Sequence, residues 1–309
     1  MKLFHSIPSY SSNKPTIVTI GTFDGVHLGH KKILQQIIEN ATVQNCESLV
    51  LTFFPHPRMV LHEGTEMKQL NTLNEKISLL ENLGIDNLVI HPFNKEFSRL
   101  TAEEFVKNVL VAAFKLNKIV IGYDHRFGRN RTANLDDLVE FGQQFGFEVQ
   151  QISAEEINDV SISSTKIRSA LEEGNITLAN EYLGYHYCMT GLVLKGKQLG
   201  RTIGYPTANI KIDEDYKLIP QNGVYITESS IDNKIVYGMM NIGTRPTVDG
   251  TTQTIEVHFF DFNKDIYNTK ITVSLLKRIR SEQKFDSLEA LKNQLNLDKT
   301  LALDFVNNL

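Results

Sequence analysis

Two histidines three positions apart lie in a glycine-rich turn near the start of the chain. His27 and His30 end the sequence Gly-Thr-Phe-Asp-Gly-Val-His-Leu-Gly-His, residues 21–30, which follows a strand-like run at 15–20 and precedes a helical pattern at 30–40. Such a turn points backbone N–H groups and the positive end of a helix dipole at one place. Its glycines let a phosphate approach, and the histidines can donate hydrogen bonds to its oxygens. The pattern favours an anion site; a zinc pair and an ordinary glycine turn are the alternatives.

A second helix start with anion-binding residues follows further along the chain. Ser164 and Thr165 are potential caps whose neighbouring N–H groups can bind phosphate, and Lys166 and Arg168 add positive charge. Two such helix starts facing one cleft suit a triphosphate whose α-phosphate is attacked while pyrophosphate leaves. That chemistry needs positioning and charge neutralisation more than a protein nucleophile. Solvated helix caps are the alternative for each part alone.

The second half of the chain carries a different set of polar groups. Residues 191–206 contain four glycines, which could wrap a phosphate chain or form a glycine-rich β-turn region. Thr207 and Asn209 share one face if the residue between them lies in a strand, and such oxygens can hold Mg²⁺. Glu256 and His258 also share one face of an alternating strand pattern, for which a solvated surface is the alternative.

The elements that must position these residues alternate between strand and helix over the first half. Strand patterns at 15–20, 48–54, 87–90, 118–122 and 147–152 are separated by helical patterns at 30–40, 74–83, 101–115 and 135–145. This alternation predicts a parallel, doubly wound sheet, in which ligands bind at the carboxyl ends of the strands. The turn at 21–30 lies at such an end. So does the segment 122–131, which holds Asp124, Arg126 and Arg131 among glycines.

From residue 188 to about 276 the chain shows short strands separated by turns. The strand patterns fall at 190–194, 208–212, 223–227, 234–240, 254–260 and 270–276, with Asp232-Asn233 as a hairpin turn. No helical pattern intervenes, so an antiparallel sheet or small barrel is expected. A final helix from Ser287 to Val306 carries Leu288, Leu291, Leu295 and Leu297 and is expected to pack on it. We therefore expect an α/β domain over 1–184 and a β domain over 185–309.

The bulk composition is that of an ordinary globular protein. The 309 residues are long for one core, and 41% hydrophobic and 22% charged residues are typical values. The net charge of −4 gives no sign of a nucleic-acid or membrane surface, and no apolar run approaches a membrane span. The N-terminus lacks a signal-peptide core and the two cysteines lie far apart, so a cytoplasmic protein is expected. The sequence does not indicate an oligomeric state.

Residues 21–30 resemble the HxGH signature of the nucleotidyltransferase superfamily, and Thr165-Lys-Ile-Arg168 resembles its (S/T)xxR signature. With Ile-Ser-Ser before Thr165, they resemble the N-terminal half of bacterial bifunctional riboflavin kinase/FAD synthetase. This resemblance implies a Rossmann-like domain that transfers adenylyl from ATP to FMN, giving FAD and pyrophosphate. His27 and His30 would bind ATP phosphates and stabilise charge on the α-phosphate. Also implied are nucleotide-site positions for Gly21, Phe23, Asp24 and Gly29, pyrophosphate contacts for Ser164, Thr165 and Arg168, and a flavin-side loop at 122–131.

Gly-Arg-Thr-Ile-Gly-Tyr-Pro-Thr-Ala-Asn-Ile at 200–210 resembles the PTAN motif of riboflavin kinases with its preceding glycine loop. Segments 222–225, 241–247, 256–258 and 280–285 match later blocks of that family in order. The resemblance implies a barrel domain that phosphorylates the riboflavin 5′-hydroxyl with ATP. Gly196 and Gly204 would shape the phosphate loop, Thr207 and Asn209 would bind Mg²⁺ and ATP, Glu256 would accept the hydroxyl proton, and Arg280 would lie near the flavin.

Two departures from the family pattern fall in the flavin-side loop. His125 occupies a position where the family commonly has phenylalanine, and a glycine is common near Ala133. A histidine ring stacks on an isoalloxazine more weakly than a phenyl ring does. We expect an enzyme with both activities that uses ATP, riboflavin and FMN as substrates and Mg²⁺ as cofactor. The alternatives are a chain that retains only the kinase activity and a flavin- or nucleotide-binding regulator without turnover.

Overall fold

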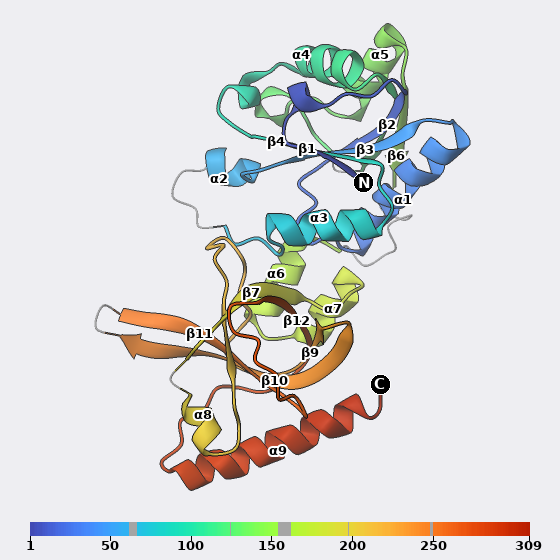
Figure 1. Cartoon of the computed structure of the whole chain (residues 1–309). Coiled ribbons are helices and arrows are strands. Elements are labelled where there is room, and N and C mark those ends of the chain that lie inside the picture. The colour runs from blue at the N-terminus through green and yellow to red at the C-terminus, as the bar shows by residue number, and fades with distance from the viewer. Residues whose placement is uncertain (62–66, 124, 154–161, 197, 248–249) are drawn as a thin grey trace. The chain divides into compact units, whose positions relative to one another are not determined.

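The computed structural model describes residues 1–61, 67–123, 125–153, 162–196, 198–247 and 250–309 (Figure 1). The chain divides into two compact units, Met1–Ser163 and Ser164–Leu309. The first unit contains a parallel sheet and the second a closed barrel. No helix in the described ranges is long and apolar enough to cross a membrane.

A six-stranded sheet forms the centre of the first unit, and its paired strands all run parallel. The strands are β1 (Lys2–Phe4), β2 (Thr16–Ile20), β3 (Glu47–Phe53), β4 (Asn87–His91), β5 (Leu116–Gly122) and β6 (Glu148–Ile152). Their order is β1-β4-β3-β2-β5-β6. The parallel sheet is confirmed. The edge strand β1 is not predicted by the sequence, because three residues are too few to show an alternating pattern.

Helices cover both faces of this sheet, which confirms the doubly wound arrangement (Figure 1). Ile17 of β2 packs with α1 and α3, whereas the next residue, Val18, packs with α4, η3 and α5 on the other face. Successive strand residues point to opposite faces, so a strand covered on both sides is apolar throughout. The elements are η1 (Ile7–Ser9), α1 (Leu28–Val43), α2 (Pro57–Leu61), α3 (Leu73–Asn82), η2 (Phe97–Arg99), α4 (Ala102–Phe105), the π-helix η3 (Val106–Ala113), η4 (Arg129–Arg131) and α5 (Leu135–Phe145).

Six antiparallel strands close into a barrel in the second unit, in the order β10-β11-β8-β7-β12-β9. They are β7 (Cys188–Leu194), β8 (Ala208–Lys211), β9 (Gly223–Ile231), β10 (Lys234–Thr247), β11 (Gly250–Phe259) and β12 (Lys270–Arg280). The barrel is confirmed, but the expectation that no helix interrupts it is wrong. The short helix α8 (Leu199–Thr202) lies between β7 and β8. A single turn is too short to produce a helical period in the sequence.

The predicted hairpin turn joins β9 to β10. Asp232 and Asn233 both adopt the left-handed conformation, with φ of 52° and 59°. Lys234 pairs with Ile231 across the turn. Two central residues with positive φ form the type I′ turn that matches the twist of paired strands, and Asn and Asp tolerate this conformation better than most residues.

The C-terminal helix α9 (Leu288–Val306) packs on the barrel as expected, but only part of the leucine set contacts the barrel core (Figure 1). Leu295 contacts the barrel core, whereas 70% of Leu288 and 59% of Leu297 are exposed. The buried face instead contains Asp298 and Ala302, both fully buried. These residues follow Leu295 at helical spacing. Because this buried stripe contains an aspartate, the positions of the leucines alone do not define it.

Two helices precede the barrel and contact it. The predicted helix is confirmed as α6 (Ser164–Glu172), and an unpredicted helix, α7 (Ile176–Leu183), follows it. The backbone N–H of Gln221 donates to the Leu171 carbonyl at 3.0 Å, and Asn180 Nδ2 donates to the Leu275 carbonyl at 2.9 Å. These contacts place both helices with the second compact unit. The boundary between residues 184 and 185 stays a prediction about functional domains.

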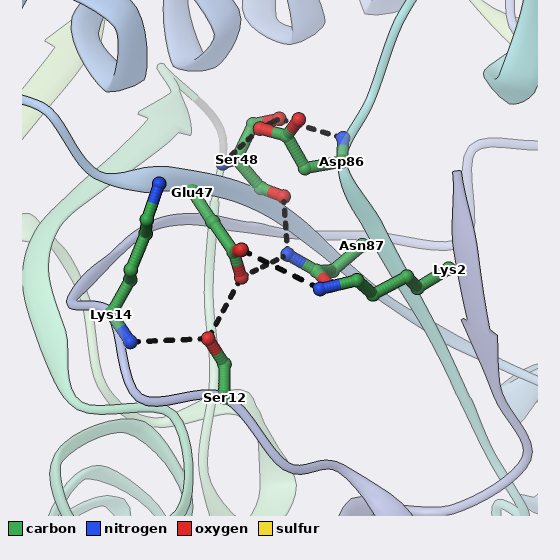
Figure 2. A network of polar contacts seen from close by, with 7 residues as sticks. All are labelled: Lys2, Ser12, Lys14, Glu47, Ser48, Asp86 and Asn87. Carbon is green, nitrogen blue, oxygen red and sulfur yellow. Dashed lines mark hydrogen bonds and ion pairs between the residues drawn. The ribbon is translucent and has the colours of Figure 1, made fainter.

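A polar network lies at the amino ends of the parallel strands, opposite the edge where ligands are expected (Figure 2). The Glu47 carboxylate accepts hydrogen bonds from Ser12 Oγ at 2.8 Å and Asn87 Nδ2 at 3.0 Å, and lies 3.6 Å from Lys2 Nζ. Asp86 accepts from the backbone and hydroxyl of Ser48 at 2.9 and 2.8 Å. The network ties the first residues of β1, β3 and β4 together.

Candidate active sites

The turn at 21–27 and the segment after Gly122 begin at neighbouring positions on the sheet. They follow β2 and β5, which are adjacent and parallel. From β2 the chain continues to β3 on one side, and from β5 it continues to β6 on the other. Ligands of doubly wound sheets bind at this switch in direction, outside the carboxyl ends of the strands. The structure thus brings together two of the polar segments selected from the sequence.

The two histidines stack at the start of α1. His27 is the N-cap residue, and its Nδ1 accepts a hydrogen bond from the backbone N–H of His30 at 3.4 Å. The ring centroids lie 3.6 Å apart with an 18° angle between the planes. Because Nδ1 is the acceptor, a neutral His27 ring carries its proton on Nε2. The capping bond thereby orients an N–H donor at the positive end of the α1 dipole.

His30 has a buried Nδ1 atom that accepts or donates no hydrogen bond within the described part of the chain. Its pKa lies well below the usual value of 6.5, because burial disfavours the charged ring and the charges of His27 and Lys76 repel a proton. The ring is therefore neutral at pH 7. A neutral imidazole can donate one hydrogen bond to a phosphate oxygen without the desolvation cost of a buried cation.

Other residues of the turn are buried beneath it and hold it by packing and by a hydrogen bond. Phe23 is buried in the core that α1 shares with the sheet, and Gly21 lies so close that a Cβ there would be 3.0 Å from the Phe23 ring. Asp24 is buried, and its Oδ1 accepts from the Leu70 N–H at 2.9 Å. Gly29 is buried in the first turn of α1. Direct contact of these four residues with a nucleotide stays a prediction.

The flavin-side loop is only partly described, and Asp124 lies outside the described residues. Arg126 and Arg131 are exposed. After Arg126 the chain folds back through an antiparallel bridge, in which Phe127 and Ala133 exchange backbone hydrogen bonds of 3.2 Å. Both bridge residues are buried, and the His125 ring stacks over Phe127 with centroids 6.1 Å apart. The departure at Ala133 therefore falls on a buried residue of the bridge.

The second predicted phosphate segment forms the start of α6. Ser164 and Thr165 are its first two residues, and Arg168 follows one turn later. Ile167 and Leu171 are fully buried and turn the helix so that Thr165 is exposed. These residues belong to the second unit, so the structure describes them separately from the histidines.

A row of polar residues crosses three neighbouring barrel strands. Glu256 of β11 pairs with Asn209 of β8 on one side and with Asn241 of β10 on the other. Directly opposed residues project to the same face of a sheet with Cβ atoms about 5 Å apart. The structure therefore brings the predicted base and a predicted magnesium ligand together. Asn241 was not selected from the sequence, because strand register cannot be read from one sequence.

The glycine segment before β8 packs against this row. A Cβ at Gly196 would lie 2.3 Å from Asn209 Nδ2, so any larger residue there would push the Asn209 amide out of its present position. Gly204 has φ of +89°, a conformation that favours glycine. Thr207 immediately precedes β8. The structure thus packs the loop against Asn209 at Gly196, and Gly204 supplies a left-handed turn between that glycine and β8.

His258 is a functional candidate to which sequence reasoning assigned no role. It is buried, so the solvated-face alternative is wrong for this position. Its Nδ1 donates to the Pro206 carbonyl at 2.8 Å, and burial lowers its pKa, so that the ring is neutral at pH 7. The bond fixes the residue before Thr207. Buried polar side chains are hydrogen-bonded, but the partner is visible only in the fold.

Arg280 binds an aspartate of α9. Its Nε donates to both carboxylate oxygens of Asp298 at 3.0 Å, and its Nη2 donates to Oδ2 at 2.7 Å. The guanidinium also lies over the Phe285 ring, 5.8 Å from its centroid. The geometry makes Arg280 a tie between β12 and α9. Contact with a flavin stays a prediction.

No three His, Cys, Asp or Glu side chains in the described ranges lie close enough together to hold a metal ion. The zinc interpretation of the histidine pair therefore has no third ligand of these kinds there. The oxygen groups of Asn209 and Glu256 form a different donor set, of the kind that Mg²⁺ prefers.

Comparisons with known proteins match both units. A family model described as FAD synthetase matches residues 9–166, and one described as riboflavin kinase matches residues 183–306. Bifunctional riboflavin kinase/FMN adenylyltransferases of Buchnera aphidicola subsp. Schizaphis graminum and Escherichia coli K12 are 38% and 37% identical to this chain, over 99% of it and 99% and 98% of their own lengths. That of Bacillus subtilis 168 is 35% identical over 95% of this chain and 93% of its own length.

A crystal structure described as a macrolide-efflux protein from Streptococcus pneumoniae is also similar, over 97% of each chain, with a TM-score of 0.89 and 32% sequence identity. The two family models follow the order of the two sets of site residues, and the curated relatives extend over nearly the whole chain. The chain therefore belongs to the bifunctional riboflavin kinase/FMN adenylyltransferase family.

Proposed function

We propose that this chain carries out both reactions for which its family is named, in the cytoplasm and on small-molecule substrates. The C-terminal part phosphorylates riboflavin with ATP to give FMN. The N-terminal part transfers adenylyl from ATP to FMN, giving FAD and pyrophosphate. The observation that supports this most strongly is the pair of polar clusters, one at the switch point of the parallel sheet and one across the barrel strands.

In the adenylyl transfer, the residues bind and orient rather than react. His27 and His30 donate to phosphate oxygens of ATP and stabilise the charge that builds on the α-phosphate. Ser164, Thr165 and Arg168 hold the pyrophosphate that leaves. The FMN phosphate oxygen attacks the α-phosphorus and the bond to the β-phosphate bridging oxygen breaks, so no protein nucleophile is needed.

In the kinase reaction, Glu256 accepts or orients the proton of the riboflavin 5′-hydroxyl. Thr207 and Asn209 would hold Mg²⁺, whose charge would offset that of the transferring phosphoryl group. Gly196 places a backbone without a side chain next to Asn209, which supports a close approach of a phosphate chain to this segment.

The two reactions can be separated in one experiment. Pure protein is incubated with Mg²⁺-ATP and either riboflavin or FMN, and the flavins are resolved by chromatography. We expect FAD from both substrates. FMN as the sole product from riboflavin would refute the adenylyltransferase assignment, and no product from either substrate would favour a binding protein.

Two variants test the residue assignments and serve as controls for each other. Glu256→Gln is expected to reduce FMN formation about a hundredfold or more while sparing the conversion of FMN to FAD. His30→Ala is expected to do the reverse. Loss of both steps to the same extent in a folded variant would contradict the assignment of separate sites.

A further inference from the structure

The turn that carries the histidines has an unusual backbone. Phe23, Gly25 and Val26 all adopt positive φ, at 46°, 86° and 37°. This conformation suits glycine but is unfavourable for phenylalanine and more so for β-branched valine. Such residues persist at functional sites where the surrounding structure holds them. The contacts that hold this turn therefore bear on the position of His27 and His30.

A buried lysine supplies one of these contacts. Lys76 lies in α3 and is 2% exposed, and its Nζ donates to the Thr22 carbonyl at 2.7 Å. The segment before α3 contacts the same turn, since the Leu70 N–H donates a hydrogen bond to the Asp24 carboxylate. Burial lowers the pKa of Lys76, and the Asp24 charge partly offsets that effect. A buried ammonium group is costly unless it is paired and hydrogen-bonded, and purely structural positions are usually better served by apolar residues.

We propose that Lys76 is a positioning residue for adenylyl transfer: it holds the Thr22 carbonyl so that the turn presents His27 and His30, and it places a fixed positive charge near the phosphate-binding histidines. The inference rests on the proposed adenylyltransferase function. Neither the family signature nor the spacing of the histidines points to this lysine, which lies on another helix.

The charge of Lys76 reaches His30. Burial, the neighbouring His27 and Lys76 all lower the pKa of His30. In the part of the chain that the structure describes, the groups that act on the His30 ring are His27 from its own helix start, Phe23 from the turn and Lys76 from α3. Removal of the lysine charge should raise the pKa of His30 whether or not ATP is present. This gives a measurement that is independent of turnover.

The test uses the full-length protein and three variants. Lys76→Met removes the hydrogen bond and the charge at similar length, and Lys76→Gln keeps a donor but not the charge. Lys118→Met is the matched control, because Lys118 is a second lysine of the same unit whose side chain is only 12% exposed, and it pairs with Glu148 at 2.8 Å. For each protein, kcat and KM for ATP are measured for FMN adenylylation, the riboflavin kinase rate is measured in the same sample, and the His30 ring is titrated by NMR.

We expect Lys76→Met to reduce kcat for FAD formation about ten- to a hundredfold, as misplacement of catalytic groups does, with the kinase rate unchanged. The His30 pKa should rise in both Lys76 variants and stay constant in Lys118→Met. Lys76→Gln, if it retains the bond to Thr22, should lose less activity than Lys76→Met. Should Lys76→Met fail to fold, Lys76→Gln still decides through its titration and its rate.

Three results would overturn the proposal: wild-type kcat in folded Lys76→Met, an unchanged His30 pKa in both Lys76 variants, or an equal loss of FAD formation in Lys118→Met. A wild-type protein that makes no FAD would instead refute the proposed function. In that case the histidine titration would still decide whether the lysine charge acts on His30.

Discussion

His258 is a buried side chain that contacts the loop in front of Thr207. Its neutral ring donates to the Pro206 carbonyl, next to Thr207, and the Tyr205 ring packs edge-on against it with centroids 5.0 Å apart. We predict that His258→Ala lowers kcat/KM of the kinase about tenfold, which corresponds to about 1.4 kcal/mol, because the carbonyl loses its partner and the loop loses its position.

His258→Asn is the matching control, since its amide N–H can replace the Nδ1 donor. We expect it to recover most of the kinase activity, and we expect FMN adenylylation to be unchanged in both variants. Equal kcat/KM in wild type and His258→Ala would show that the bond to Pro206 does not position the loop for the kinase reaction.

At the scale of residues, the sequence indicates which side chains can do chemistry but not which side chains lie next to them in the fold. Glu256 and Asn209 could be predicted as site residues because each is a polar residue in a segment with a strand pattern. Their direct pairing, and the presence of Asn241 beside them, depend on strand register. Register is set by packing and turn geometry over the whole barrel, which a single sequence does not display.

At the scale of elements, the helix α9 depends on a charged tie. Asp298 is fully buried, accepts from Arg280 through both oxygens and also accepts from Gln294 Nε2 at 2.9 Å. Removing one partner of a buried pair leaves the other charge uncompensated. We predict that Asp298→Ala lowers the unfolding free energy of the second unit by about 3–5 kcal/mol.

Asp304→Asn, on an exposed position of the same helix, is the control and should change stability by less than about 0.5 kcal/mol. The measurement is chemical denaturation followed through the kinase activity and compared with FMN adenylylation. If Asp298→Ala lost both activities at the same denaturant concentration as the wild type, the Arg280–Asp298 pair would not stabilise the barrel.

The elements that sequence reasoning missed share one property. β1, α2, α7 and α8 are each eight residues or shorter, so they hold few repeats of any period. Long patterns were predicted well, because an apolar strand covered on both faces or an amphipathic helix repeats its signal. The leucines of α9 gave an incomplete picture of its buried stripe for a physical reason. That stripe also includes Asp298, an aspartate that can be buried because Arg280 and Gln294 bind it.

At the scale of the whole molecule, the two ends of the parallel sheet carry different sets of polar residues. The carboxyl ends carry the turn with the histidines, and the amino ends carry the Glu47 network (Figure 2). Burial of Glu47 raises its pKa, but hydrogen bonds from Ser12 and Asn87 and the charges of Lys2 and Lys14 lower it by more. Its pKa therefore lies below the usual value of 4.5.

This shift predicts how acid acts on the first unit. Because the folded pKa of Glu47 is lower than the unfolded one, its contribution to stability is complete above the unfolded value and is lost as pH falls through the folded value. Glu47→Gln should therefore lower the unfolding free energy at pH 7 by about 1–3 kcal/mol, since a charged acceptor is lost. The difference from wild type should shrink below pH 4.5.

The control is Glu148→Gln, at a carboxylate that is 65% exposed, which should show a smaller difference in unfolding free energy across the same pH range. Denaturation measured from pH 7 down to pH 3 checks both variants, and a Glu47→Gln difference that stayed constant with pH would mean that its charge does not stabilise the sheet.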